Sequence, residues 1–327
     1  METIPDSDTL VGSTSIPKSE AHIHVSVIIV SWNVREYLVE CIKSVQRMSA
    51  GFPIEIVVVD NASSDGTVEC IKNAFPSVLL IANSTNVGFA RANNQGLAVA
   101  RGHYTLFLNP DTLLLNDALK VLAQFLDEHQ EAGFVGPRLL GADGETQGAC
   151  ARPFLSFKQA IIETVLPYSM SGLYKPPVVD YETAGSVDAI SGAAMMARTA
   201  FIRSLGGFGN QFLHCGEDVD LCWRADRSGK HNWYLPSARV FHYLGKSAEQ
   251  DRTVTATKVL FSTYEYILAT HGKGKAFIYK AAVITIQIPL TLVRGLIKCI
   301  SGEETWKELA MHLRMARRLA RWHFPLD

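Results

Sequence analysis

Two β-branched runs near the start of the chain, with a helical pattern between them, constrain the fold most strongly. Val25–Ser31 and Ile54–Asp60 are almost wholly apolar, which is typical of buried parallel strands. Between them, over about residues 35–47, apolar residues recur at helical spacing. Strands that alternate with helices in this way predict a mostly parallel sheet with right-handed crossovers.

The same alternation continues to residue 112. Asn61–Gly66 is a turn rich in helix-capping residues, and it precedes a second expected helix. We expect a short strand near Val78–Ile81, a helix that opens within Asn86–Gly96, and a further strand from Tyr104. The chain therefore begins with an α/β unit whose sheet is flanked by helices.

Two of these expected strands end in an acidic residue. Asp60 closes one, and Asn109, Pro110 and Asp111 follow the strand that begins at Tyr104. Pro110 ends the strand ladder because it has no N–H donor. Ligands of open α/β sheets bind at the carboxyl ends of strands, where Asn and Asp oxygens suit a hard cation that carries phosphate. The same residue types are common in turns and caps, so these positions alone leave both interpretations open.

The sequence excludes several other classes of protein. It contains neither G-x-G-x-x-G nor G-x-x-x-x-G-K-[S/T], which argues against a dinucleotide-binding Rossmann domain and a P-loop NTPase. A net charge of −1 gives no reason to expect nucleic-acid binding. None of the six cysteines forms a C-x-x-C pair, so we expect neither a zinc site nor a disulfide scaffold, but a reducing, cytoplasmic location.

Four motifs along the chain resemble those of family 2 glycosyltransferases. They are Val25–Asn33, Val59–Thr67, Asn86–Phe89 with Asn93–Asn94, and Asn109–Asp111. A second block, from Ser191 to Ser247, resembles the acceptor half of the same family. The resemblance implies an inverting enzyme of GT-A fold that uses a nucleotide-sugar, and the subgroup nearest in pattern is rhamnosyltransferase-like, from bacterial surface polysaccharide synthesis.

The resemblance also implies a domain order. We expect a disordered tail at residues 1–22, because this stretch is polar, and a GT-A-like catalytic domain at residues 23–250. This domain would comprise a nucleotide-binding half, 23–112, and an acceptor half, 113–250. A helical, basic amphipathic appendage would follow at residues 251–327.

Between the two informative blocks, from about residue 113 to 188, the sequence carries less signal. We expect a helix over Asp117–Glu128, a strand at Phe134–Pro137 and a tight turn at Ala142–Glu145. Phe154–Asp180 mixes aromatic residues, Pro and Gly, and predicts loops with one helix over the sheet and a place for acceptor contacts.

For the donor, the resemblance assigns roles residue by residue. The residues implied in nucleotide-sugar binding are Asn33, Asp60, Asn61, Arg91, Asn94, Asn109 and Asp111. Asp60 would contact the base or ribose, and Arg91 the phosphates. A divalent cation, Mn²⁺ or Mg²⁺, is implied at Asp111, Asn109 and His242; many relatives carry an acid where this chain has Asn109. A surface arginine and a packed histidine at a strand end remain alternatives for Arg91 and His242.

For the acceptor, the crowded acids Glu217, Asp218 and Asp220 begin a predicted helix. The helix dipole favours acids there, so capping explains one of them. Crowded carboxylates disfavour one another's charge, a cost more often tolerated at functional sites. The resemblance makes Asp218 the general base, with Glu217 and Asp220 orienting it or binding acceptor hydroxyls.

The end of the chain is apolar and then basic. Ala281–Val293 is a clean apolar run, shorter than the ~20 residues of a membrane span. Glu303–Phe324 predicts an amphipathic helix, and residues 271–327 hold ten Lys and Arg against four acids, a net charge of +6. Such a region suits peripheral association with an anionic membrane. A helical subdomain packed on the catalytic domain and a homodimer interface are the alternatives.

The predicted reaction is inverting, metal-assisted transfer of a sugar, with rhamnose the first choice. The donor is a nucleoside-diphosphate sugar, and the acceptor is a hydroxyl of a glycan or lipid-linked glycan at the cytoplasmic face of the inner membrane. A catalytically inactive glycan- or nucleotide-binding scaffold is one alternative. A sugar-phosphate nucleotidyltransferase is the other, although Ser31–Asn33 is not the Gly-rich, basic loop that such an enzyme needs.

Overall fold

A computed structural model of the protein describes residues 23–165, 179–212, 216–243 and 252–301, together with 310, 313 and 314. The described residues fall into two compact units. The first holds residues 23–153, 179–210 and 217–243, and the second holds 154–165, 211–212, 216 and the residues from 252 onward. The sequence predicted one boundary near residue 250, whereas here residues 154–165 also group with the C-terminal helices.

Parts of three expected segments cannot be compared with the structure. The expected N-terminal tail lies outside the described residues, as do residues 166–178 of the aromatic stretch. The expected amphipathic helix Glu303–Phe324 is also outside them, apart from residues 310, 313 and 314.

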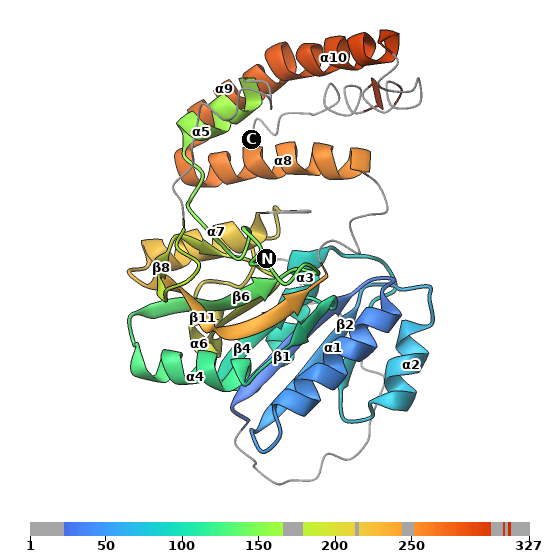
Figure 1. The fold of residues 1–327 in the computed structure, drawn as a ribbon, viewed down its shortest axis with the longest axis vertical. Coiled ribbons are helices and arrows are strands. Elements are labelled where there is room, and N and C mark those ends of the chain that lie inside the picture. The colour runs from blue at the N-terminus through green and yellow to red at the C-terminus, as the bar shows by residue number, and fades with distance from the viewer. Residues whose placement is uncertain are drawn as a thin grey trace, which may run out of the picture. The chain divides into compact units, whose positions relative to one another are not determined.

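A mixed sheet forms the centre of the first unit, and it has nine strands within the described residues (Figure 1). The strand order is β3-β2-β1-β4-β10-β6-β11-β5, with β8 beside β11. The first four strands in the chain are parallel, as the sequence predicted. They are β1 (Val25–Ser31), β2 (Ile54–Asp60), β3 (Leu79–Ala82) and β4 (Tyr104–Leu108). Strand β10 is antiparallel to β4, so the predominance of parallel pairs is confined to this half.

Seven further strands lie in the described residues of the first unit. They are β5 (Thr112–Leu114), β6 (Ala132–Leu140), β7 (Ala151–Arg152), β8 (Gly185–Val187), β9 (Ala189–Ile190), β10 (Ala194–Arg198) and β11 (His231–His242). The helices are α1 (Arg35–Met48), α2 (Thr67–Ala74), α3 (Phe89–Val99), α4 (Ala118–Glu128), α6 (Thr199–Ser204) and α7 (Glu217–Arg227). The short strands β7 and β9 pair separately from the main sheet.

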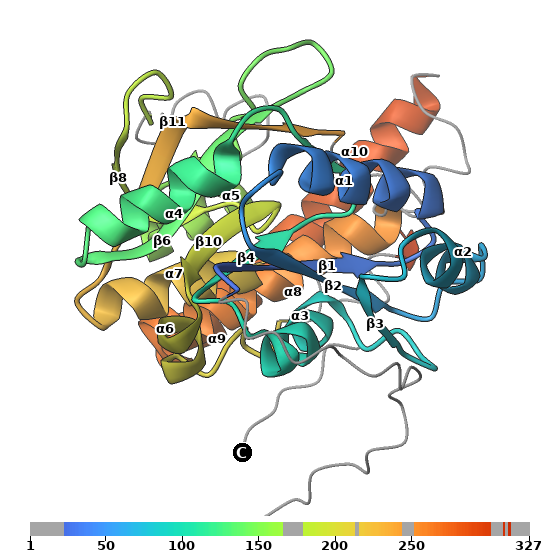
Figure 2. The same cartoon turned by 90° about the horizontal axis from the view of Figure 1, so that it is seen from below.

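Alternate side chains of β1 enter two different layers. Val27 and Ile29 pack in the main apolar cluster with residues of α1 and α4, whereas Ile28 faces α3. Figure 2 shows α1 and α4 on one side of the sheet and α3 on the other. A Cβ on Gly96 of α3 would lie 2.5 Å from Ile28, so a glycine is needed for the helix to approach the sheet this closely.

Strand register brings the end of β4 beside the end of β11. Strand β11 pairs antiparallel with β5, and His242 lies opposite Thr112. It also pairs parallel with β6, with Phe241 opposite Leu140. Because Asp111 immediately precedes Thr112, this register makes Asp111 and His242 neighbours although 131 positions separate them in the sequence.

The second unit is helical in the part that the structure describes. Its helices are α5 (Phe157–Val165), α8 (Arg252–His271), α9 (Lys273–Ala282), η2 (Val283–Gln287) and α10 (Ile288–Ile300). The last three run on without a break, and η2 is a π turn. Pro289 follows it and lacks the N–H that an α-helix needs, which accounts for the wider turn.

One helical stretch in the described part of the chain, Lys273–Val293, could cross a membrane by its length and composition. Its mean hydropathy is 1.7. It is longer than the apolar run Ala281–Val293, which the sequence analysis considered too short, because the helix continues through α9. The apolar helical stretch is therefore longer than the sequence predicted. The core helix of a soluble protein can have the same length and composition.

Candidate active site

The loops after β1 and β2 hydrogen-bond to one another. Asn33, at a φ of 53°, accepts the N–H of Ser64 on Oδ1 at 2.8 Å and donates its own N–H to Ser63 Oγ at 2.9 Å. Asp60 accepts the N–H of Ser63 on Oδ2 at 2.9 Å. Its other oxygen, Oδ1, is buried without a hydrogen-bond partner among the described residues. Buried carboxylate oxygens are rarely unpaired, so a donor from a ligand would complete this position.

Asn61 joins the end of β2 to the loop before α3. Its Oδ1 accepts the N–H of Val87 at 2.9 Å, and its Nδ2 donates to Asn86 Oδ1 at 2.9 Å. The amide of Asn61 thus fixes the loop before α3 against the end of β2. Arg91, on the first turns of α3, is exposed.

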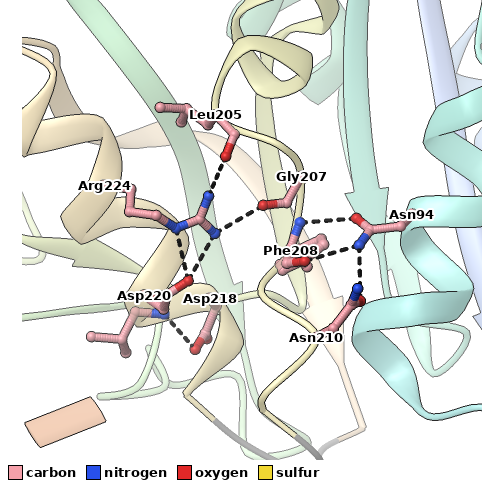
Figure 3. A network of polar contacts seen from close by, with 9 residues as sticks. Asn94, Leu205, Gly207, Phe208, Asn210, Asp218, Asp220 and Arg224 are labelled. Carbon is pink, nitrogen blue, oxygen red and sulfur yellow. Dashed lines mark hydrogen bonds and ion pairs between the residues drawn. The ribbon is translucent and has the colours of Figure 1, made fainter. Parts of the chain in front are cut away.

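Asn94 and Asp220 hold one turn from two sides (Figure 3). The amide of Asn94 accepts the N–H of Phe208 and donates to its carbonyl, both at 2.9 Å. Asp220 forms an ion pair with Arg224 at 2.7 Å, and the same guanidinium donates to the carbonyl of Gly207 at 2.8 Å. The sequence analysis assigned Asn94 and Asp220 to donor and acceptor; in the structure their polar atoms hold the turn after α6.

Asp111 and His242 face one another in a buried position. His242 Nε2 lies 3.5 Å from Asp111 Oδ1, and the two side chains are 7% and 6% exposed. No other described group hydrogen-bonds to this nitrogen. At the opposite side of the ring, Nδ1 lies 2.9 Å from Gln147 Oε1, and Gln147 Nε2 donates to the His242 carbonyl at 2.8 Å.

The donor set at this position fits a divalent cation. Carboxylate oxygen and imidazole nitrogen both bind Mn²⁺, and Mg²⁺ prefers the carboxylate. Nε2 is also an orphaned buried polar atom, which a positive charge between it and Asp111 would satisfy. Within the described residues no group of three or more His, Cys, Asp or Glu could hold a metal. The remaining ligands would therefore come from substrate phosphate, water or Asn109, which lies at the same strand end.

Asp218 is held by donors from three parts of the chain. Arg152 Nη2 lies 2.8 Å from both carboxylate oxygens. The N–H of Gly192 donates to Oδ2 at 2.9 Å, and that of Val219 to Oδ1 at 2.8 Å. The negative charge of Asp218 raises the pKa of Arg152 above its ordinary value. The chain therefore supplies this carboxylate with its own cation.

Glu217 lies next to Asp218 and has a different environment. It is 9% exposed, and its Oε2 has no hydrogen-bond partner among the described residues. Burial, and then the charge of Asp218, raise the pKa of Glu217 to about 8. Burial thus favours the protonated form of Glu217, whereas its neighbour Asp218 has the guanidinium of Arg152 against both oxygens.

The turn before β10 joins the two acidic centres. Gly192 donates to Asp218, and the next residue, Ala193, accepts the N–H of Asn109 at 2.9 Å. Because consecutive Cα atoms are about 3.8 Å apart, the strand end that carries Asn109 and Asp111 meets the start of α7 at this turn. A Cβ on Gly192 would lie 3.2 Å from that of Asp218, so glycine permits the close approach.

Gln147 and Arg152 were not predicted from the sequence. Both lie in the poorly informative region, on the segment between β6 and β9. Pairing of Arg152 with Ala189, and of Leu140 with Thr146, brings this segment to the site. The available signal was an amide and a cation shortly after the predicted turn Ala142–Glu145, which is too common a pattern to single them out.

Comparison with known protein families gives one match over more than half of the chain. The model of the family described as Glycosyl transferase family 2 matches residues 26–204. Among curated proteins, the chain is 25% identical over 241 residues to N-acetylglucosaminyl-diphospho-decaprenol L-rhamnosyltransferase of Mycobacterium tuberculosis, covering 67% of this chain and 76% of that protein. It is 27% identical over 237 residues to pre-mycofactocin glycosyltransferase of the same organism, covering 72% and 46%.

Solved structures give the same fold. The structure of GalNAc-T7 with UDP, GalNAc and Mn²⁺ superposes with a TM-score of 0.52 at 17% identity, covering 78% of this chain and 52% of that one. The structure of Staphylococcus aureus TarS residues 1–349 superposes with a TM-score of 0.50 at 16% identity, covering 93% of each chain. These likenesses confirm the expected GT-A-like α/β fold with C-terminal helices.

Proposed function

The chain belongs to glycosyl transferase family 2, and from this premise and the site geometry we propose that it transfers a sugar from a nucleoside-diphosphate sugar to a hydroxyl of a glycan or lipid-linked glycan, with inversion. One observation carries the proposal. The turn at Gly192 and Ala193 joins the Asp111–His242 pair to Asp218, which suits a reaction that must neutralise a diphosphate and deprotonate a hydroxyl close together.

Rhamnose, carried by deoxythymidine diphosphate, is our first choice of donor. It is supported by the 25% identity to a protein named as an L-rhamnosyltransferase. Asp60 would select the nucleotide, because its buried, unpaired Oδ1 is complementary to the imide N–H of thymine or uracil. Arg91, which is exposed at the start of α3, would contact the phosphates.

On the donor side, Asp111 and His242 would hold a divalent cation, Mn²⁺ or Mg²⁺, with Asn109 beside them. When bound, the cation acts as a Lewis acid on the diphosphate leaving group. Asp111 contributes the negative charge that attracts it, and His242 a neutral ligand. Because both side chains are almost fully buried, water screens the attraction between Asp111 and the cation little.

On the acceptor side, Asp218 would be the general base. The acceptor oxygen forms a bond to the anomeric carbon while the bond from that carbon to the diphosphate oxygen breaks. The hydroxyl proton passes to Asp218, and the bonding electrons leave with the diphosphate. Arg152 and the Gly192 N–H orient the carboxylate, and the protonated Glu217 avoids placing a second negative charge beside it.

We also propose peripheral contact with anionic lipid at the cytoplasmic face of the inner membrane. Within the described residues, several apolar side chains of α9 and α10 are more than half exposed: Phe277, Ile278, Val293, Ile297 and Ile300. The net charge of +6 over residues 271–327 complements anionic headgroups. We expect the protein to cosediment with phosphatidylglycerol vesicles but not with phosphatidylcholine vesicles. A dimer that is stable at high salt and binds neither kind of vesicle would favour the dimer interface.

The reaction itself is tested with a panel of nucleotide-sugars. Thermal shift with UDP, GDP and dTDP, each with and without Mn²⁺ or Mg²⁺, identifies the donor class, and sugar transfer to lipid-linked and soluble glycans follows. A metal-dependent shift with one nucleotide and inverted product is expected. Binding without turnover on every acceptor would favour the scaffold, and release of pyrophosphate from a nucleoside triphosphate would favour the nucleotidyltransferase.

A further inference from the structure

We propose that Gln147 is a positioning residue that fixes which nitrogen of His242 is free to bind a cation. The proposal rests on the proposed function, because it takes Asp111 and His242 as the cation ligands. It also gives a role to a segment that the sequence motifs do not cover.

The hydrogen bonds of Gln147 determine the tautomer of His242. A backbone carbonyl can only accept a hydrogen bond, so the atom of Gln147 that lies 2.8 Å from the His242 carbonyl must be the amide nitrogen. The amide oxygen therefore faces Nδ1, at 2.9 Å. Because this oxygen can only accept, Nδ1 must carry a proton. The lone pair of a neutral ring is then on Nε2, the nitrogen that lies 3.5 Å from Asp111.

The backbone around Gln147 is anchored on both sides. Its N–H donates to the carbonyl of Leu139 at 2.8 Å, and its carbonyl accepts the N–H of Cys150 at 3.0 Å. The hydroxyl of Tyr181 donates to the carbonyl of Gly148 at 2.7 Å. Gln147 is thus held in place by several bonds that do not involve its own side chain, so the side chain can impose its orientation on the histidine.

Without Gln147, the imidazole could take its other tautomer. Nε2–H would then donate to Asp111, and a cation would have to displace that proton. Groups that orient metal-binding histidines commonly contribute 10–100-fold to metal affinity. We therefore expect removal of the amide to weaken Mn²⁺ affinity about 10–100-fold.

The experiment compares Gln147→Leu, which keeps the approximate size but removes both hydrogen bonds, with Gln124→Leu. Gln124 is exposed on α4, outside the site, and serves as the matched control. Side-chain ¹⁵N NMR of histidine-labelled full-length protein reports the tautomer, with His242→Gln assigning the signal. Electron paramagnetic resonance of free Mn²⁺ measures its affinity with UDP or dTDP present.

We expect a neutral His242 ring protonated at Nδ1 in the wild type, a change of tautomer in Gln147→Leu, and weaker Mn²⁺ binding in that variant alone. A wild-type ring protonated only at Nε2 overturns the proposal, and so does unchanged Mn²⁺ affinity in a folded Gln147→Leu. The tautomer of His242 in the wild type tests the proposal even if Gln147→Leu does not fold. This NMR measurement needs no ligand, so its outcome does not depend on the proposed function. The proposed function fails instead if no nucleotide binds.

Discussion

Asp218 and Asp111 are both buried carboxylates, but their neighbouring side chains differ in charge. Asp218 has its cation within the chain, since Arg152 contacts both of its oxygens. Asp111 instead faces the imidazole of His242, at 3.5 Å from Nε2. Both carboxylates are largely buried, so neither charge is well solvated by water. The charge of Asp218 is therefore balanced by a residue of the chain, whereas Asp111 is suited to bind a cation from outside it.

The same contrast separates Asp218 from its neighbour Glu217. Arg152 forms an ion pair with Asp218, whereas burial and then the charge of Asp218 raise the pKa of Glu217 to about 8. Adjacent acids at one helix start therefore have different electrostatic environments because of their tertiary partners, and not because of their residue types.

The largest expected effect comes from removing the carboxylate that the fold completes. Asp218→Asn should lower sugar transfer about 10²–10⁴-fold, because the general base is lost, while nucleotide binding stays nearly unchanged. Steady-state kinetics and nucleotide titration measure the two effects. Asp226→Asn changes an exposed acid on the same helix and should have wild-type activity. Near wild-type turnover in Asp218→Asn would show that another group is the base.

The next effect concerns the carboxylate that depends on an external charge. Asp111→Asn should lower transfer roughly 10²–10³-fold and abolish the dependence of nucleotide binding on Mn²⁺ or Mg²⁺. Thermal shift with dTDP or UDP, with and without metal, reports this loss. Asp117→Asn, an exposed acid after β5, is the control. If metal dependence persists in Asp111→Asn, the cation binds elsewhere.

Arg152→Ala would remove the difference between the two carboxylates, because Asp218 would lose its internal cation. The side chain of Arg152 is 34% exposed and that of Asp218 is 12% exposed, so we expect a loss of only about 1–2 kcal/mol in the free energy of unfolding. Transfer should fall roughly tenfold or more, because the base loses its orientation.

Urea denaturation and kinetics test Arg152 together. Arg152→Lys keeps the charge but not the planar contact with both oxygens, and should recover part of the activity. Equal behaviour of the lysine and alanine variants would mean that the positive charge of Arg152 has no part in orienting Asp218.

The last prediction concerns stability and not activity, and it depends on pH. The pKa of Glu217 is about 8 in the folded chain, against an ordinary value of 4.5. Between these values the folded state binds more protons than the unfolded state, so this residue makes stability fall as the pH rises. Glu217→Gln should therefore be more stable than the wild type by a few kcal/mol above about pH 8, with the gap closing towards pH 4.5. Parallel pH curves for the two proteins would contradict the shift.

The sequence predicted the donor half of the fold well. The strands at Val25, Ile54 and Tyr104 and the helices between them are all present, because their apolar patterns are local and strongly periodic. The helix that ends at Glu128 is also confirmed. For the site, the resemblance indicated Asp111, His242 and Asp218, and the structure brings them to connected positions.

Asn94 and Asp220 show that a motif does not determine which groups a polar side chain contacts. A polar residue within a motif can bind a ligand or hold a turn, and only its neighbours decide between these roles. In the structure the amide of Asn94 bonds to the backbone of Phe208, and Oδ2 of Asp220 bonds to Arg224. Spacing alone could not pair Asn94 with Phe208, because 114 positions separate them, whereas Arg224 lies four positions after Asp220 on the same helix.

By itself, the sequence determined the α/β rhythm, the acids at the strand ends and the family, because these depend on local periodicity and on short motifs. Tertiary contacts decided the partners of His242 and Asp218. Gln147 reaches His242 over 95 positions, and Arg152 reaches Asp218 over 66, through the register of β6, β7, β9 and β11. The physical reason is that the charge, proton and tautomer of a buried group depend on the groups within a few ångströms of it, and folding alone brings those groups together.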